Sequence, residues 1–116
     1  DTKVKGVFVD FMGRTAYTPL GASRLLADTE AALVPMVMTR REDGKYRFII
    51  YPELPTVKTI NPSDDLIINT INQNKVIEDM IRKNPAQWVW MHQRWKTTPE
   101  SLERYLKARA LEKTRK

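Results

Sequence analysis

The sequence predicts an α/β domain in which a partial mixed sheet is flanked by helices, with elements in the order β-α-β-β-α-α-α. Runs rich in β-branched and aromatic residues at 6–11, 32–38 and 45–51 are typical of short strands. Segment 62–83 places apolar residues at the spacing of one helical face. Proline next to short polar or acidic residues marks the helix starts between these runs.

The first predicted strand is GVFVDF, from Gly6 to Phe11, and Gly13 closes it. The residues RTAYTP at 14–19 then predict a loop. Thr18 stands at an N-cap position and Pro19 at the first helical position, so a helix is expected from about Pro19 to Glu30.

A pair of strands is predicted in the middle of the chain. The segment Ala32 to Met38 is almost entirely apolar, which predicts a strand buried on both faces. Pro35 has no N–H for a ladder bond and therefore indicates an edge position or a bulge. Asp43-Gly44 predicts a hairpin turn that leads into a return strand from Lys45 to Tyr51.

The second half of the chain is predicted to be helical. A helix is expected from Asn61-Pro62 to about Lys83, ended by Asn84-Pro85. A new helical turn from Pro85 then carries WVWMHQRWK, and Thr98-Pro99 starts a last polar helix that runs to the C-terminus. Roughly half of the circumference of the 62–83 helix is apolar, with the residues Leu66, Ile67, Ile71, Ile77, Met80 and Ile81.

Composition bounds the classes of protein that the chain can represent. A length of 116 residues fits one domain, and the absence of cysteine excludes disulfides and thiolate metal sites. The longest apolar run, Ala31 to Met38, is too short to span a bilayer. The chain begins at Asp1 without methionine and enters a strand almost at once, so we expect a processed or truncated part of a longer protein.

Charge is distributed unevenly along the chain. The formal net charge is +6, and residues 103–116 contain six basic and two acidic side chains. This bias favours anionic partners such as phospholipid head groups, nucleic acid or an acidic protein. The alternative is a solvated basic tail that binds nothing.

The sequence contains few motifs of catalysis or metal binding. His92 is the only histidine, and without cysteine it cannot complete a usual zinc site, so no metal or cofactor is expected. The glycines at 6, 13, 21 and 44 form no phosphate loop, and no serine lies in a GxSxG elbow. The adjacent acidic pairs Asp64-Asp65 and Glu78-Asp79 diverge on a helix and indicate a helix start and a solvated face.

The segment WVWMHQRWK allows several interpretations. On a helix, none of the residues near His92 is acidic, which favours a structural or hydrogen-bonded histidine over a general base. Trp88 and Trp95 would share one helical face and Trp90 another. Tryptophans on two sides indicate a helix buried between neighbours more than a stacking platform for nucleic acid.

The segment NPAQWVWMHQRWKT, residues 84–97, resembles the C-terminal signature of the bacterial lipid A biosynthesis acyltransferases, the lauroyl and myristoyl transferases of the lysophospholipid acyltransferase superfamily. The family pattern is Pro-x-Gln-aromatic, then Trp, and His-x-Arg-aromatic-Lys-Thr. It is met here by Pro85, Gln87, Trp88, Trp90, His92, Arg94, Trp95, Lys96 and Thr97.

The resemblance covers residues 4–97 through three further segments. GVFVDFMGRTAYTPLGASRLL is similar to the family segment with a Phe-Phe-Gly-Arg motif, although Met12 stands in the second aromatic place. ALVPMVMTRREDGKYRFII resembles the Val-Pro strand, and NKVIEDMIRKNPAQW the helix before the signature. The resemblance implies that residues 1–97 are the C-terminal portion of a glycerolipid-acyltransferase-like domain. Residues 98–116 carry no family signature and are expected to form a basic polar helical tail.

The resemblance also implies an activity and a location. Enzymes of this family move a fatty acyl chain from acyl carrier protein, or from coenzyme A in relatives, to a hydroxyl of a lipid A precursor at the cytoplasmic face of the bacterial inner membrane. They use an H-x4-D/E pair, whereas Thr97 stands five residues after His92. We therefore expect no catalytic residue in this chain, an inactive chain on its own, and a catalytic pair and membrane anchor upstream of Asp1. Another glycolipid, such as a phosphatidylinositol mannoside, is an alternative acceptor.

The family motifs assign two sets of candidate site residues. The resemblance implies that the substrate-binding set is Phe11, Gly13, Arg14, Thr18 and Arg40, and that the packing and positioning set is Gln87, Trp90, His92, Arg94 and Lys96. Arg14 is expected in a loop before a helix N-terminus, where it would help bind phosphate. A surface arginine at a tight turn, and an ordinary hairpin charge at Arg40, are the alternatives. Arg94 and Lys96 remain available to anionic groups.

Several partners are expected from these features. Half a sheet should leave exposed edges and apolar surface, which predicts a need for the missing N-terminal half or for self-association. The tail would lie on an anionic membrane through a thin apolar stripe of Leu102, Tyr105 and Leu106, unless it is simply solvated. The alternative function is a non-catalytic module that binds an anionic lipid, nucleic acid or an acidic protein through Arg14, the signature and the tail.

Overall fold

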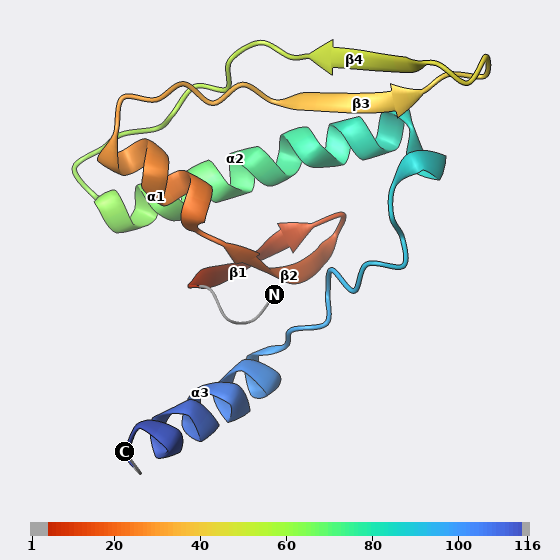
Figure 1. Cartoon of the computed structure of the whole chain (residues 1–116). Coiled ribbons are helices and arrows are strands. Elements are labelled where there is room, and N and C mark those ends of the chain that lie inside the picture. Colours follow the sequence, from red (N-terminus) through yellow and green to blue (C-terminus); the bar gives the residue numbers. More distant parts are fainter. Residues whose placement is uncertain (1–4, 115–116) are drawn as a thin grey trace.

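The computed structural model describes residues 5–114 and consists of two small antiparallel sheets arranged about a long central helix (Figure 1). A mixed α/β composition is confirmed, but the predicted single sheet is replaced by two hairpins. The elements in chain order are β1 (Gly6–Phe11), β2 (Arg14–Pro19), α1 (Gly21–Asp28), β3 (Met36–Arg40), β4 (Tyr46–Ile50), α2 (Pro62–Lys83), the 3₁₀ turn η1 (Pro85–Gln87) and α3 (Pro99–Thr114).

The first hairpin contains a strand where a loop was predicted. Residues 14–19 form β2, which pairs with β1 in the register Phe8↔Tyr17 and Val9↔Ala16. The two turn residues, Met12 and Gly13, have φ angles of 55° and 78°. Two successive positive φ angles are typical of a tight turn whose twist matches that of the strands. The loop prediction failed because this turn contains no Asn-Gly or Asp-Gly signal.

The helix after this hairpin begins later than predicted. Thr18 pairs with Val7 inside the sheet, and α1 starts at Gly21 with Leu20 as its N-cap residue. The prediction of Thr18 as a helix cap was therefore wrong. Arg14 lies at the far end of β2 from α1, so it does not lie before a helix N-terminus.

The β3–β4 hairpin turns at Asp43-Gly44 as predicted, but only one of its faces is covered. The strand begins at Met36, directly after Pro35, so the proline lies outside the ladder that pairs Met36 with Ile50. The prediction of a strand buried on both faces was wrong. The outer face of the hairpin consists of side chains that are each more than half exposed, namely Met36, Met38, Tyr46, Phe48 and Ile50.

Helix α2 has the predicted bounds, but its buried residues are mostly polar. Ile81 is buried, whereas Ile67 and Ile77 are more than a third exposed. The predicted apolar face is therefore only partly packed. The other buried residues of α2 are polar, and we call them the polar stripe: Asp65, Asn69, Thr70, Asn74 and Glu78. Successive members lie four residues apart, except for the adjacent pair Asn69 and Thr70.

The polar stripe attaches neighbouring segments to α2 by hydrogen bonds. The Asp65 carboxylate accepts bonds from the backbone N–H and the hydroxyl of Thr59, both at 2.7 Å. Asn69 accepts from the Val57 N–H at 2.8 Å and donates to the Val57 carbonyl at 3.0 Å. In the described part of the chain, every buried side-chain nitrogen or oxygen has a partner. The stripe therefore joins α2 to its surroundings without an unsatisfied polar group.

The segment after α2 differs most from the prediction. Helix η1 ends at Gln87, and residues 88–98 form irregular turns in place of the predicted helix. Their side chains reach the first hairpin instead of packing along a helical axis, as described below. Figure 1 shows α3 projecting away from the other elements, and none of its residues is buried.

The predicted last helix forms over residues 99–114, and its extension to residues 115–116 lies outside the described residues. No helix in the described range combines the length and the hydropathy that a bilayer span requires.

We expect Asn69→Ala to lower the free energy of unfolding by about 2 kcal/mol, because it leaves the Val57 N–H and carbonyl without their partner. Urea denaturation followed by tryptophan fluorescence measures this change. Asn72→Ala is the matched control, since Asn72 lies on the same helix outside the polar stripe. Equal effects of the two substitutions would contradict the structural role of the stripe.

Candidate functional site

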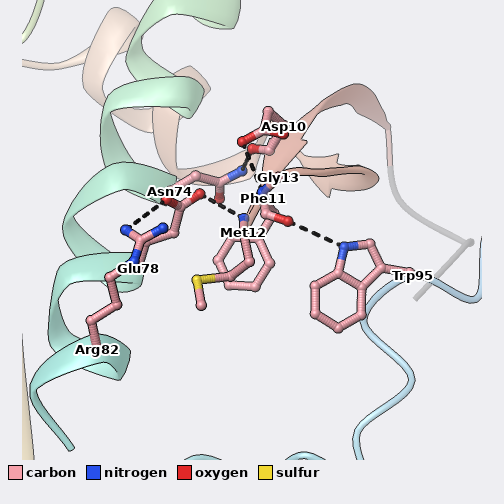
Figure 2. A network of polar contacts seen from close by, with 8 residues as sticks. All are labelled: Asp10, Phe11, Met12, Gly13, Asn74, Glu78, Arg82 and Trp95. Atoms are coloured by element: carbon pink, nitrogen blue, oxygen red, sulfur yellow. Dashed lines mark hydrogen bonds and ion pairs between the residues drawn. The ribbon is translucent and has the colours of Figure 1, made fainter. Parts of the chain in front are cut away.

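The turn of the β1–β2 hairpin is held in place from two sides. The Met12 N–H donates to Oε1 of Glu78 at 2.8 Å, and the Gly13 N–H donates to Oδ2 of Asp10 at 3.3 Å (Figure 2). Asn74 donates from its amide to the Asp10 carbonyl at 3.2 Å. Glu78 is buried, and its second oxygen accepts from Arg82 at 3.3 Å. These bonds fix a turn in which a non-glycine residue has a positive φ.

Phe11 forms the centre of a small aromatic core next to this turn. Its ring is 1% exposed and lies 6.4 Å from the ring of Trp88 and 5.8 Å from that of Trp95, measured between centroids. The Trp95 indole N–H donates to the Phe11 carbonyl at 3.3 Å, as Figure 2 shows. The signature segment, which we define as residues 85–97, therefore folds back onto the first hairpin.

Arg94 attaches the signature segment to β2. Its Nη1 donates to the Tyr17 carbonyl at 2.9 Å and its Nη2 to the Thr18 hydroxyl at 2.7 Å. The guanidinium also lies 4.7 Å from the centroid of the Phe11 ring. Burial lowers the pKa of Arg94 from its usual value, but an arginine remains charged at neutral pH. Among residues 5–114, no carboxylate lies within ion-pair distance of it.

Arg14 follows the turn directly and is exposed to solvent. Its guanidinium lies 5.2 Å from the Trp95 ring centroid, which is a cation–π contact. The expected combination of Arg14 with helix N-terminal amides is not formed, because β2 separates the arginine from α1. The sequence-based alternative, a surface arginine at a tight turn, describes its position correctly.

Arg40 lies at the end of β3 and is held there through its backbone. The Arg40 N–H donates to Oε1 of Gln87 at 2.7 Å, and Nε2 of Gln87 donates to the Arg40 carbonyl at 3.0 Å. Gln87 therefore positions the end of β3 as a strand partner would. In Figure 1 the β1–β2 turn and the end of β3 both lie on the side of the molecule where α2 ends.

The remaining signature residues lie at the surface. Trp90 is 53% exposed and donates from its indole to the Pro85 carbonyl at 2.7 Å. His92 and Lys96 are exposed and line a groove of about 650 Å³, which we call the signature groove. Its lining residues are Phe11, Tyr17, Thr18, Pro19, Gln73, Asn74, Ile77, Trp88, His92, Gln93, Arg94, Lys96 and Thr97.

The structure divides the sequence-predicted residues into groups. Five of them line the signature groove: Phe11, Thr18, His92, Arg94 and Lys96. Gly13 and Arg14 form the adjacent turn, and Gln87 holds Arg40 at the neighbouring strand end. Which of these residues contact substrate stays a prediction.

Two residues that support the site were missed by sequence reasoning. Glu78 was interpreted as part of a solvated face, although it is buried and holds the Met12 N–H. Asn74 was not selected at all. The available signal was the recurrence of short polar or acidic side chains at helical spacing through the polar stripe, which indicates one face of α2 with buried hydrogen bonds. Within residues 5–114, no cluster of three or more potential metal ligands occurs.

Comparisons with known proteins identify similar sequences. The model of the family described as Bacterial lipid A biosynthesis acyltransferase matches residues 1–97. A lipid A biosynthesis lauroyltransferase of Escherichia coli K12 is 38% identical over 98 residues, which cover 83% of this chain and 31% of the relative. A lipid A biosynthesis acyltransferase of Haemophilus influenzae is 30% identical over 102 residues, covering 87% of this chain and 30% of the relative.

A lipid A biosynthesis palmitoleoyltransferase of Escherichia coli K12 is 36% identical over 70 residues, which cover 60% of this chain and 21% of the relative. The chain thus spans less than a third of the length of these relatives. No solved structure matches the chain.

We expect Arg94→Lys to lower the free energy of unfolding by about 1–2 kcal/mol, because a lysine cannot reach both acceptors on β2 and stack on Phe11. Thermal unfolding followed by tryptophan fluorescence measures the change. Arg104→Lys, on the exposed surface of α3, is the matched control and should leave the transition unchanged. A tolerated Arg94→Lys would show that the signature segment does not depend on this contact.

Proposed function

The chain belongs to the bacterial lipid A biosynthesis acyltransferase family, and we propose that it forms part of an enzyme that transfers a fatty acyl chain to a hydroxyl of a lipid A precursor. The observation that carries this proposal is the meeting of the family motifs at one end of α2. The turn after Phe11, the end of β3 and the signature segment are far apart in sequence. The signature segment bonds to the end of β3 through Gln87 and Arg40, and to the start of the turn through Trp95 and Phe11. Acyl carrier protein or acyl-coenzyme A is the proposed donor.

Arg14 is the first candidate for contact with the acceptor. It is exposed and charged, and it follows a turn that Glu78 and Asp10 hold in one conformation. A fixed arginine suits an anionic group because its planar fork loses little freedom on binding. Phe11, Gly13 and Thr18 take an indirect part: Phe11 anchors the turn, Gly13 forms it, and Thr18 holds Arg94. Arg40 contributes a second exposed cation at the neighbouring strand end.

The catalytic pair is proposed to come from another segment of the enzyme. His92 is the single histidine of the chain, and neither its neighbours nor Thr97 provides a carboxylate to orient it. A chain of 116 residues on its own is therefore expected to transfer no acyl group. We place the working enzyme at the cytoplasmic face of the inner membrane, with the C-terminal segment 98–116, whose net charge is positive, against anionic lipid.

The outer face of the β3–β4 hairpin is proposed to be covered in the working enzyme. Its five apolar or aromatic side chains are each more than half exposed, and both strands have an unpaired edge within the described residues. Such a surface favours association with another sheet or helix layer. The relatives are more than three times as long as the matched segment, and we propose that the corresponding additional portion covers this face.

A chimera tests the proposed function. Residues 5–97 would replace the matching segment of the lauroyltransferase relative, and transfer of a labelled lauroyl chain to a lipid A precursor would be measured. We expect the chimera to be active and Arg14→Ala within it to lower kcat/KM by about 100-fold, because a charged donor to the substrate is lost.

Arg24→Ala is the matched control in the chimera, since Arg24 is exposed and pairs only with Asp28 in the described structure. It should leave the rate unchanged. A folded but inactive chimera, or one in which Arg14→Ala keeps full activity, would contradict the proposal. The isolated 116-residue chain should show no transfer under the same conditions.

The covered face gives a separate prediction for the isolated chain. Phe48→Glu should reduce self-association, because it places a charge in the centre of the exposed apolar face. Sedimentation velocity over a range of concentrations measures the change. Ile60→Glu is the control, since Ile60 is equally apolar and 94% exposed but lies outside that face. A wild-type chain that stays monomeric at all concentrations would contradict the prediction.

A further inference from the structure

The signature groove carries a positive charge that the described residues do not neutralise. Arg94 and Lys96 both line it, and no acidic side chain does so. Arg94 is half-buried and bonds only to neutral acceptors, the Tyr17 carbonyl and the Thr18 hydroxyl. A partly desolvated cation without a counter-ion is unfavourable, and an anion that enters the groove removes this cost.

The groove offers further groups that suit a polar anion. The Arg94 guanidinium keeps N–H groups beyond the two that bond to β2. Lys96 is exposed on the same loop and can turn its ammonium toward a ligand. The side chains of Ile77 and Trp88, which line the same groove, provide an apolar wall beside these cations. A fork-shaped and a point-like cation together fit the several oxygens of a phosphate.

We propose that the signature groove binds a phosphate monoester, with Arg94 and Lys96 as its cationic ligands and the apolar wall against the group that carries the phosphate. This inference rests on the proposed function only for the source of the phosphate, which would be the lipid acceptor. The choice of a phosphate as ligand rests on the two cations and the apolar wall of the groove. The signature segment thereby gains a binding role in addition to its packing role.

The single histidine makes the proposal directly measurable. His92 lines the groove, so its imidazole cross-peaks report on ligand binding without ambiguity of assignment. The intact 116-residue chain would be titrated with inorganic phosphate and with glucose 1-phosphate at constant pH and ionic strength. Glucose and sodium chloride are the controls. We expect saturable shifts of the His92 signals with the phosphate probes and none with the controls.

Substitutions separate the groove from general attraction to a basic protein. Lys96→Ala should weaken the binding of glucose 1-phosphate by about fivefold, because one exposed charge is lost from the site. Lys75→Ala, an identical change on the exposed side of α2 outside the groove, should alter it by less than about twofold. Lys96 is exposed, so its replacement leaves the fold intact, whereas Arg94 also supports β2.

A vesicle experiment distinguishes a lipid phosphate from a soluble one. Phosphatidylcholine vesicles with and without phosphatidic acid would be added to the chain and to the Lys96→Ala variant. A lipid head group is assigned if the His92 signals broaden only with vesicles that contain phosphatidic acid, and if Lys96→Ala removes this broadening. A soluble phosphate is assigned if the chain binds glucose 1-phosphate but neither kind of vesicle. Either result supports a phosphate site.

The absence of any His92 response to every phosphate probe would overturn the proposal, as would equal weakening by Lys75→Ala and Lys96→Ala. Such a failure is independent of the chimera assay. An active chimera with no phosphate response would leave the proposed acyl transfer in place and remove only the groove from it.

Discussion

The polar stripe of α2 is the constraint on which the rest of the structure depends. Burying carboxylates and amides is unfavourable unless each finds a hydrogen-bond partner, so the stripe dictates where neighbouring backbone must lie. Asp65 and Asn69 fix the loop at 57–59, Thr70 bonds to Ser23 of α1 at 2.7 Å, and Glu78 fixes the β1–β2 turn. The helix thereby sets the position of α1 and of the β1–β2 turn, although few large apolar side chains are buried beside it.

Local signals in the sequence were sufficient for most elements but not for their packing. Proline at the helix starts and Asp43-Gly44 at the second turn act through their own backbone, which is why α2, α3 and the β3–β4 hairpin were predicted within a few residues. The β1–β2 turn was missed because the Met12 N–H is bonded to Glu78, which is 66 residues away in sequence, and a local pattern cannot show such a contact. Residues 88–98 were predicted as helix from their local pattern alone. Their contacts with Phe11 and β2, which hold them in turns, join residues far apart in sequence and leave no local signal.

The candidate site shows the same division between chemistry and placement. The residue types at Arg14 and Arg94 identified two cations that belong to family motifs. Their surroundings came only from the structure: Arg14 stacks on Trp95, and Arg94 is held by Tyr17 and Thr18. The placement of Arg14 before a helix failed because it assumed that RTAYTP was a loop. Because residues 14–19 form a strand instead of a loop, no helix N-terminus lies beside Arg14. Any phosphate that Arg14 binds would therefore contact its side chain without help from helix amides.

The contacts also connect the exposed sheet face to the first hairpin. A partner that covers Met38 and Phe48 would order β3, whose end is bonded through both backbone groups of Arg40 to Gln87. Gln87 precedes Trp88, which packs on Phe11 beside the turn that carries Arg14. A partner on the sheet face would therefore also stabilise, through Gln87 and Trp88, the segment that packs beside the turn of Arg14.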